Sequence, residues 1–129
     1  MARIILVDDD PVIGDLVVNS MIDAGHAIGW IADAATALRV MRQRAPHLAI
    51  IDCVMPGMSG VELLRTMRSE GTLCHVPAVM LTARQSSQDE AIAYCAGADD
   101  YLRKPIDLDF LIGRINALLS APRSRLRAG

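Results

Sequence analysis

The sequence has few cysteines, few aromatic residues and no long apolar run, and each shortage excludes a class of protein. Cys53, Cys74 and Cys95 are far apart and include no Cys-x-x-Cys pair, so neither a disulfide framework nor a zinc site is expected. One tryptophan, two tyrosines and one phenylalanine are too few for a platform on which nucleic-acid bases stack. No apolar stretch approaches the roughly 20 residues that cross a bilayer.

Strong charge of either sign is also missing. Thirteen Lys and Arg residues oppose 15 Asp and Glu, and the net charge is −2. The basic residues are scattered, apart from a short cluster near the C-terminus, so the chain is not expected to bind nucleic acid directly. No signal-peptide pattern precedes the first apolar segment, which predicts a cytoplasmic protein without a membrane partner.

What the sequence does contain is apolar residues, at 52% of 129 positions, enough for one domain with a substantial core. Short apolar segments alternate with segments of helical periodicity. Several of the apolar segments are continuously hydrophobic, as strands covered on both faces must be. Alternation of this kind predicts an α/β protein with a doubly wound parallel sheet. The predicted strands are residues 3–8, 26–31, 47–52, 77–82 and 100–103.

The segments between these strands carry signals for helix ends. Asp10 precedes a proline that favours the first helical position, so Asp10 is a predicted N-cap. The Ser-x-x-Glu motifs that begin at Ser59 and Ser87 have the spacing of capping boxes. Gly97 lies where a left-handed residue would end a helix. In the first helix, Leu16 is predicted to face the core, and Trp30 is expected to be a half-buried packing residue in the second strand.

Polar residues follow the predicted strands at the edge where such sheets bind ligands, the carboxyl ends of the strands. Asp8 and Asp9 end the first strand, and Asp52 ends the third. Thr82 ends the fourth strand, and Lys104 follows the fifth. Three carboxylates on neighbouring strand ends form an oxygen-rich pocket that suits Mg²⁺. A hydroxyl and an ammonium facing that pocket suit an oxyanion such as a phosphoryl group.

These features resemble the receiver domain of bacterial two-component response regulators, over residues 2–120. The resemblance implies a flavodoxin-like (CheY-like) fold, with five parallel strands in the order 2-1-3-4-5 and five helices. Residues 1–120 would be the receiver domain and 121–129 a basic C-terminal tail or linker. The pattern fits both a stand-alone receiver and a receiver joined to an output domain. The segments that carry the resemblance are LVDDDP, IIDCVMPGMSGVELL, VMLTA and DDYLRKP.

The resemblance implies a phosphoryl-accepting site. Asp52 resembles the phosphoacceptor, which receives a phosphoryl group from a sensor histidine kinase or a phosphotransfer protein. Asp8 and Asp9 resemble the acidic pair that holds Mg²⁺ together with Asp52, and the backbone carbonyl of Val54 resembles a further ligand. Val54 and Arg84 flank the pocket. Because Val54 has no polar group to orient a water, slow loss of the phosphoryl group is predicted.

The resemblance also implies a switch. Thr82 resembles the hydroxyl residue that turns toward the phosphoryl group, Lys104 the lysine that contacts it, and Tyr101 the switch aromatic. The switch would act on the face formed by the fourth helix, the fifth strand and the fifth helix, residues 86–119. This face would control a downstream effector domain or protein, and a phosphorylation-dependent dimer through it is expected. Such a domain is not an enzyme; only self-phosphorylation from phosphodonors and self-dephosphorylation are expected.

A different class of protein also fits the first motif. ILVDDDPV matches the D-x-D-x-[TV] opening of haloacid-dehalogenase-type, Mg-dependent phosphatases, with Asp8 as nucleophile and Asp10 as acid–base. Against this alternative, the chain is short for that fold with a cap domain, and the segment DCVMPGMSG would have no explanation. The two interpretations differ in which aspartate carries the phosphoryl group.

Overall fold

The computed structural model describes residues 1–83 and 86–121. Within these residues, strands and helices alternate along the chain, and all strand pairs are parallel. The order of the five-stranded sheet, β2-β1-β3-β4-β5, confirms the predicted doubly wound α/β fold. The strands are β1 (Arg3–Val7), β2 (Ala27–Ile31), β3 (Leu48–Asp52), β4 (Ala78–Thr82) and β5 (Asp100–Arg103).

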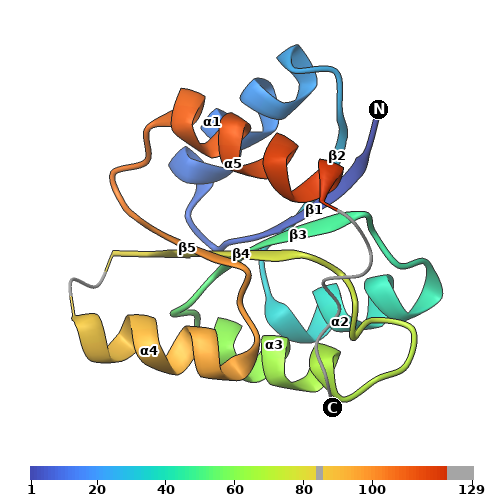
Figure 1. The fold of residues 1–129 in the computed structure, drawn as a ribbon, viewed down its shortest axis with the longest axis vertical. Coiled ribbons are helices and arrows are strands. Elements are labelled where there is room, and N and C mark those ends of the chain that lie inside the picture. The colour runs from blue at the N-terminus through green and yellow to red at the C-terminus, as the bar shows by residue number, and fades with distance from the viewer. Residues whose placement is uncertain (84–85, 122–129) are drawn as a thin grey trace.

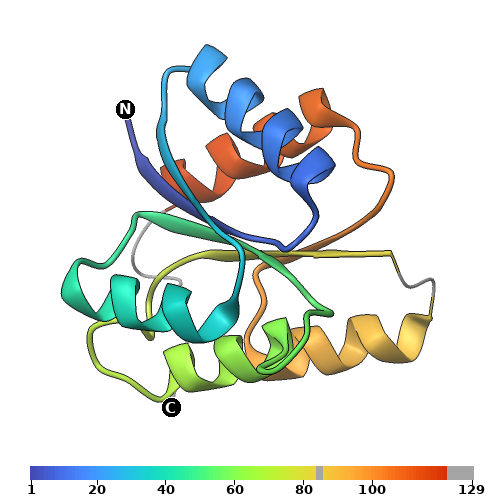
Figure 2. The same ribbon diagram turned by 180° about the vertical axis from the view of Figure 1, so that it is seen from behind.

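Helices cover both faces of the sheet. Figure 1 shows α1 and α5 on one face and α2, α3 and α4 on the other, and Figure 2 shows the same three layers from behind. A parallel sheet covered in this way must bury its central strands on both sides. The helices are α1 (Pro11–Asp23), α2 (Ala34–Gln43), α3 (Gly60–Arg68), α4 (Ser87–Ala96) and α5 (Leu108–Ser120).

The continuous apolar runs of the sequence form the two central strands. Every residue of β3 and β4 is buried, and alternate side chains enter the two cores on opposite faces of the sheet. Ile50 packs in the core under α1 and α5, whereas Ile51 packs in the core under α2, α3 and α4. Burial on both faces holds the register of these strands, and therefore the positions of the residues at their carboxyl ends.

The predicted helix ends are largely confirmed. The Asp10 side chain caps α1, and Ser59 forms a complete capping box with the glutamate three residues ahead at the start of α3. Gly97 ends α4 in the left-handed conformation, with a φ of 112°. The box predicted at Ser87 is wrong: Ser86 is the N-cap of α4 and Ser87 the first helical residue. Of two adjacent serines, the one in extended backbone directs its hydroxyl to the free N–H groups of the first turn.

Leu16 does not face the core. Its exposed fraction is 48%, whereas Val17 and Met21 of the same helix are fully buried. Adjacent residues on an α-helix are about 100° apart, so the narrow stripe centred on Val17 and Met21 leaves Leu16 toward solvent. The contact between α1 and the sheet is narrower than the apolar content of the helix suggests.

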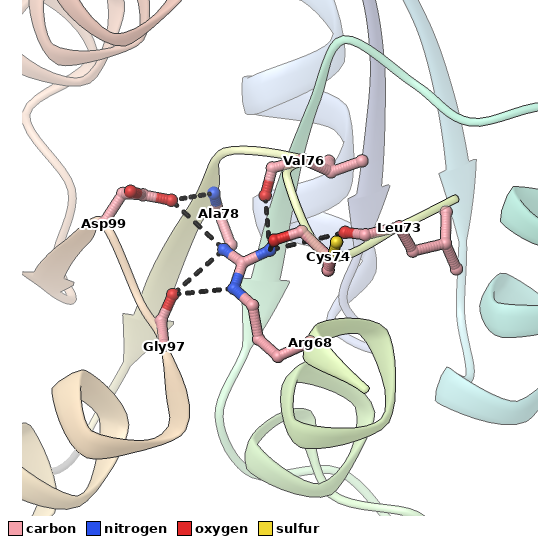
Figure 3. Close-up of polar contacts among 7 residues, drawn as sticks. All are labelled: Arg68, Leu73, Cys74, Val76, Ala78, Gly97 and Asp99. Atoms are coloured by element: carbon pink, nitrogen blue, oxygen red, sulfur yellow. Dashed lines mark hydrogen bonds and ion pairs between the residues drawn. The ribbon is translucent and has the colours of Figure 1, made fainter. Parts of the chain in front are cut away.

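At the amino ends of β4 and β5, a buried arginine joins four segments of the chain (Figure 3). Arg68, the last residue of α3, donates to the carbonyls of Gly97 (2.9 and 3.0 Å) and Val76 (2.7 Å). It pairs with Asp99 at 3.2 Å, and Asp99 also accepts from the N–H of Ala78 at 2.9 Å. We call this group the Arg68 cluster. It ties the ends of α3 and α4 to the sheet.

Candidate functional site

The carboxyl ends of β1 and β3 meet at one edge of the sheet and bring three carboxylates together. Val7 pairs with Ile51 in the register, so the residues that follow them, Asp8 and Asp52, are neighbours. One carboxylate oxygen from each of Asp8, Asp9 and Asp52 lies within 4.8 Å of the others. Asp8 and Asp52 are buried, and Asp9 is exposed. We call these three residues the acidic pocket.

One ammonium group faces this pocket. The Nζ of Lys104, just after β5, lies 3.1 Å from Asp8 Oδ2 and 3.8 Å from Asp52 Oδ1. The Lys104 backbone N–H donates to the carbonyl of Thr82 at 2.7 Å, and the Lys104–Pro105 peptide bond is cis. Three carboxylates therefore share one ammonium, and the pocket holds an excess of negative charge.

The electrostatics of Asp52 report this excess. Burial raises the pKa of Asp52 to about 6, and the charge of Asp8 adds to the increase. Lys104 and the backbone N–H of Val54, which donates to Asp52 Oδ1 at 3.4 Å, act in the opposite direction. A cation in the pocket would favour the ionised carboxylate. An all-oxygen set of carboxylates with unbalanced charge fits a hard divalent cation such as Mg²⁺.

Asp10, the third aspartate of the first motif, does not join the pocket. Its side chain accepts the N–H of Val12 at 2.9 Å as the cap of α1. Its own backbone N–H donates to Asp8 Oδ1 at 2.9 Å. The run of three aspartates is thus divided between a helix cap and the pocket, and Asp10 helps to orient Asp8.

The segment after Asp52 is shaped by a close backbone approach. A side chain at Gly60 would place its Cβ 1.9 Å from the carbonyl oxygen of Asp52, so only glycine fits there. The N–H of Gly60 donates to the carbonyl of Cys53 at 3.1 Å. This contact holds the first turn of α3 against the end of β3. It explains a glycine to which the sequence alone assigned no role.

Thr82 and Tyr101 lie together on the other side of the pocket. Thr82 is fully buried, and Tyr101 is only 8% exposed. Burial raises the pKa of the Tyr101 hydroxyl, whereas the neighbouring Thr82 hydroxyl lowers it. The ring of Tyr101 is 6.3 Å from that of Tyr94 on α4. A cavity of about 220 Å³ extends from Thr82 and Val54 toward α4.

One residue near the pocket was given only a packing role by its sequence. Trp30 is 38% exposed, which agrees with that expectation, but its indole Nε1 also donates to the backbone carbonyl of Asp8 at 2.8 Å. The two residues are far apart in the chain and meet only because β2 pairs with β1. No local pattern in the sequence signals this bond.

Two predicted features lie outside the described residues. Arg84, expected to flank the pocket, is one. The other is the basic tail, because residues 122–129 are not described. Among the described residues, no helix is long and apolar enough to span a membrane.

Comparisons with known proteins agree on one family. A model of the family described as "Response regulator receiver domain" matches residues 4–116. The transcriptional regulatory protein CseB of Streptomyces avermitilis is 38% identical over 95% of this chain and 54% of its own length. The chemotaxis protein CheY4 of Vibrio cholerae is 28% identical, with a TM-score of 0.86 over 92% of this chain and 98% of that chain.

A further solved structure bears on the acidic pocket. It is the receiver domain of a sensor histidine kinase from Pseudomonas aeruginosa, with a magnesium ion coordinated in its active site cleft. It is 26% identical, with a TM-score of 0.86 over 93% of this chain and 98% of that chain. Magnesium is thus bound in the active site of a protein with this fold.

The matches decide between the two classes of protein that the first motif fits. The chain spans about half the length of the curated relatives it matches, and the family model covers most of it. The phosphatase alternative is not supported, and the Asp10 side chain that it requires as acid–base caps a helix instead. With fold, pocket and matches in agreement, this chain belongs to the family of response regulator receiver domains, the signalling domains of two-component systems.

Proposed function

We propose that Asp52 accepts a phosphoryl group from a phosphohistidine of a sensor histidine kinase or phosphotransfer protein. The observation that carries this proposal is the position of Asp52. Its carboxylate is 5% exposed and lies where Asp8, Asp9 and Lys104 converge. Burial among like charges raises its free energy when ionised, so a reaction that adds a phosphoryl group and recruits cations is favoured there.

The chemistry needs a nucleophile and cations. A carboxylate oxygen of Asp52 attacks phosphorus, and a P–O bond forms while the P–N bond to the donor imidazole breaks. The imidazole leaves as a neutral ring after taking a proton from solvent. The transition state spreads negative charge over the phosphoryl oxygens, and Lys104, already 3.8 Å from Asp52, can pair with one of them.

Mg²⁺ is the metal that the pocket fits. Asp8, Asp9, Asp52 and the backbone carbonyl of Val54 would hold it, and bound Mg²⁺ would neutralise charge on the phosphoryl oxygens. The support is the all-oxygen donor set within 4.8 Å and the shortage of positive charge around it. Val54, whose side chain is 48% exposed and apolar, offers no group to orient a water, so hydrolysis should be slow. Phosphate release faster in Val54→Asn than in wild type is expected; equal rates would contradict this.

The phosphoryl group would act on the face of residues 86–119. It adds about −1.5 to −2 of charge, for which Thr82 and Lys104 are the natural partners. Tyr101 is already buried beside Thr82, so the inward position of the switch is available to this sequence. Phosphorylation would then shift a population toward that arrangement. Whether the signal leaves through an effector domain, an effector protein or a dimer, this face is the proposed route.

The division of the chain follows from this function. Residues 1–120 would form the receiver and 121–129 a tail or linker. The relatives are about twice as long as the matched region, which supports a receiver joined to an output domain. Apart from taking a phosphoryl group from small phosphodonors and losing it by hydrolysis, the domain would have no activity of its own.

Labelling with acetyl phosphate tests the proposal. With Mg²⁺ present, intact-mass analysis should show one added phosphoryl group that is stable in acid and labile in base. Asp52→Asn should remove it, and EDTA should prevent it. Asp10→Asn is the matched control, because it alters a neighbouring carboxylate outside the pocket and should retain the label. Wild-type labelling of Asp52→Asn would overturn the proposal.

Amide exchange tests the switch. Thr82→Ala should still accept the phosphoryl group on Asp52 but should lose most of the exchange change over residues 86–119 that phosphorylation causes in wild type. If those residues respond identically in the two proteins, the proposed roles of Thr82 and Tyr101 are wrong.

A further inference from the structure

The indole of Trp30 holds the loop that carries the acidic pair. Trp30 lies opposite Leu6 in the β1–β2 register, so its side chain is on the face of the sheet covered by α1. From there Nε1 donates to the carbonyl oxygen of Asp8 at 2.8 Å. The bond joins an edge strand to the loop that follows β1.

Every other polar atom of Asp8 is also held. Its backbone N–H donates to the carbonyl of Ile31 at 3.2 Å. Its two carboxylate oxygens contact the N–H of Asp10 at 2.9 Å and the Nζ of Lys104 at 3.1 Å. The Trp30 bond completes this set. Because the peptide unit is planar, fixing the Asp8 carbonyl also fixes the N–H and Cα of Asp9, whose exposed side chain depends on the backbone for its direction.

Gly14 of α1 makes room for the indole. A Cβ at Gly14 would lie 2.1 Å from Trp30 Cζ2 and 2.3 Å from Cε2, so any other residue would push the ring away. Gly14 is buried in the first part of a helix that Asp10 caps. The ring is therefore seated between α1 and β2, with its N–H directed at the loop between β1 and α1.

We infer that Trp30 is a positioning residue for the metal site: it orients the Asp8–Asp9 peptide and thereby the two carboxylates that would bind Mg²⁺. The inference rests on the proposed function of the acidic pocket. Partners that orient metal ligands are worth about 10- to 100-fold in metal affinity. An N–H bond to the backbone, acting on two ligands at once, belongs in this class.

Mg²⁺ titration calorimetry on Trp30→Phe tests the inference. Phenylalanine keeps an aromatic ring but has no N–H, so the Mg²⁺ dissociation constant should rise about tenfold. Arg3→Met is the matched control, because Arg3 donates side-chain N–H groups to the carbonyl of Ala45 at 3.0 and 3.2 Å at the opposite end of β1. Its Mg²⁺ affinity should equal that of wild type. An affinity of Trp30→Phe within twofold of wild type would overturn the inference.

A second variant tests the seat of the ring. Gly14→Ala should displace the indole and weaken Mg²⁺ binding as Trp30→Phe does, whereas the double variant should be no weaker than either single one. Additive losses would show that Gly14 and Trp30 act separately and would overturn the inference.

Labelling separates positioning from a general structural defect. At saturating Mg²⁺, Trp30→Phe should be phosphorylated by acetyl phosphate at the wild-type rate; a deficit that excess Mg²⁺ does not restore would contradict the inference. If wild type itself binds no Mg²⁺, the proposed function fails first, and that outcome is distinct from normal binding by the Trp30 variant.

Discussion

The two ends of the same sheet treat buried charge in opposite ways. At the amino ends of β4 and β5, the guanidinium of the Arg68 cluster meets one buried carboxylate and several carbonyls, and its side chain is only 10% exposed. At the carboxyl ends of β1 and β3, the acidic pocket sets three carboxylates against the single ammonium of Lys104. One end is balanced and the other is not.

The difference separates stability from function. Buried charge is tolerated when it is paired and hydrogen-bonded, and the Arg68 cluster meets that condition while it holds α3 and α4 to the sheet. The acidic pocket does not meet it, as the raised pKa of Asp52 shows. Excess negative charge held by a rigid backbone is a binding site for a cation. The four predictions that follow test this contrast, from the largest expected effect to the smallest.

Removing the arginine should cost most. Arg68→Met leaves Asp99 buried without its cation, and breaking a buried pair in this way costs about 3–5 kcal/mol of unfolding free energy. Urea denaturation measures it. Arg42→Met is the control, because Arg42 pairs with Glu70 on the surface and its loss should change stability little. Equal effects of the two substitutions would mean that the Arg68 cluster is no anchor.

Adding Mg²⁺ should stabilise only through the acidic pocket. At a Mg²⁺ concentration of 100 times the dissociation constant, a ligand specific for the folded state stabilises it by about 2.7 kcal/mol. Thermal denaturation with Mg²⁺ and with EDTA measures this gain. Asp9→Ala should lose most of it, whereas Asp23→Ala, which changes an exposed carboxylate at the end of α1, should keep it. A full gain in Asp9→Ala would contradict the proposed ligand set.

Neutralising Asp52 should stabilise the metal-free protein. Its pKa is about 6 when folded, against a model value of 3.8, so the folded state holds the proton more tightly and stability falls as pH rises between these values. In EDTA at pH 7, Asp52→Asn should gain about 2 kcal/mol, a value reduced for solvent screening. The gain should shrink in Mg²⁺. Denaturation that shows Asp52→Asn to be less stable than wild type in EDTA would refute the idea of unbalanced charge.

The helix cap beside the pocket should affect stability alone. Ser59→Ala removes the capping box of α3 and should cost about 1 kcal/mol. Because Ser59 is outside the acidic pocket, labelling by acetyl phosphate should be unchanged. Ser59→Asp, which can still cap the helix, is the control for stability. A loss of labelling in Ser59→Ala at a temperature where it is folded would show that the cap also serves the site.

The local patterns of the sequence determined the architecture. Continuous apolar runs such as those of β3 and β4 are typical of strands buried on both faces, and residues such as Asp10 and Ser59 cap helices through bonds to the next few residues. Because parallel strands share one carboxyl edge, the order of strands alone was enough to predict that Asp8, Asp9 and Asp52 meet. Their roles in phosphoryl transfer remain predictions.

Tertiary structure decided what depends on distant segments. The choice of Ser86 over Ser87 as a cap, and the exposure of Leu16, follow from how the helices lie on the sheet. The Arg68 cluster joins segments that have no common local pattern. The bond from Trp30 to the Asp8 carbonyl requires β2 to pair with β1 and α1 to leave space for an indole. Periodicity reports which face of an element is apolar, but only packing decides which particular side chains meet across it.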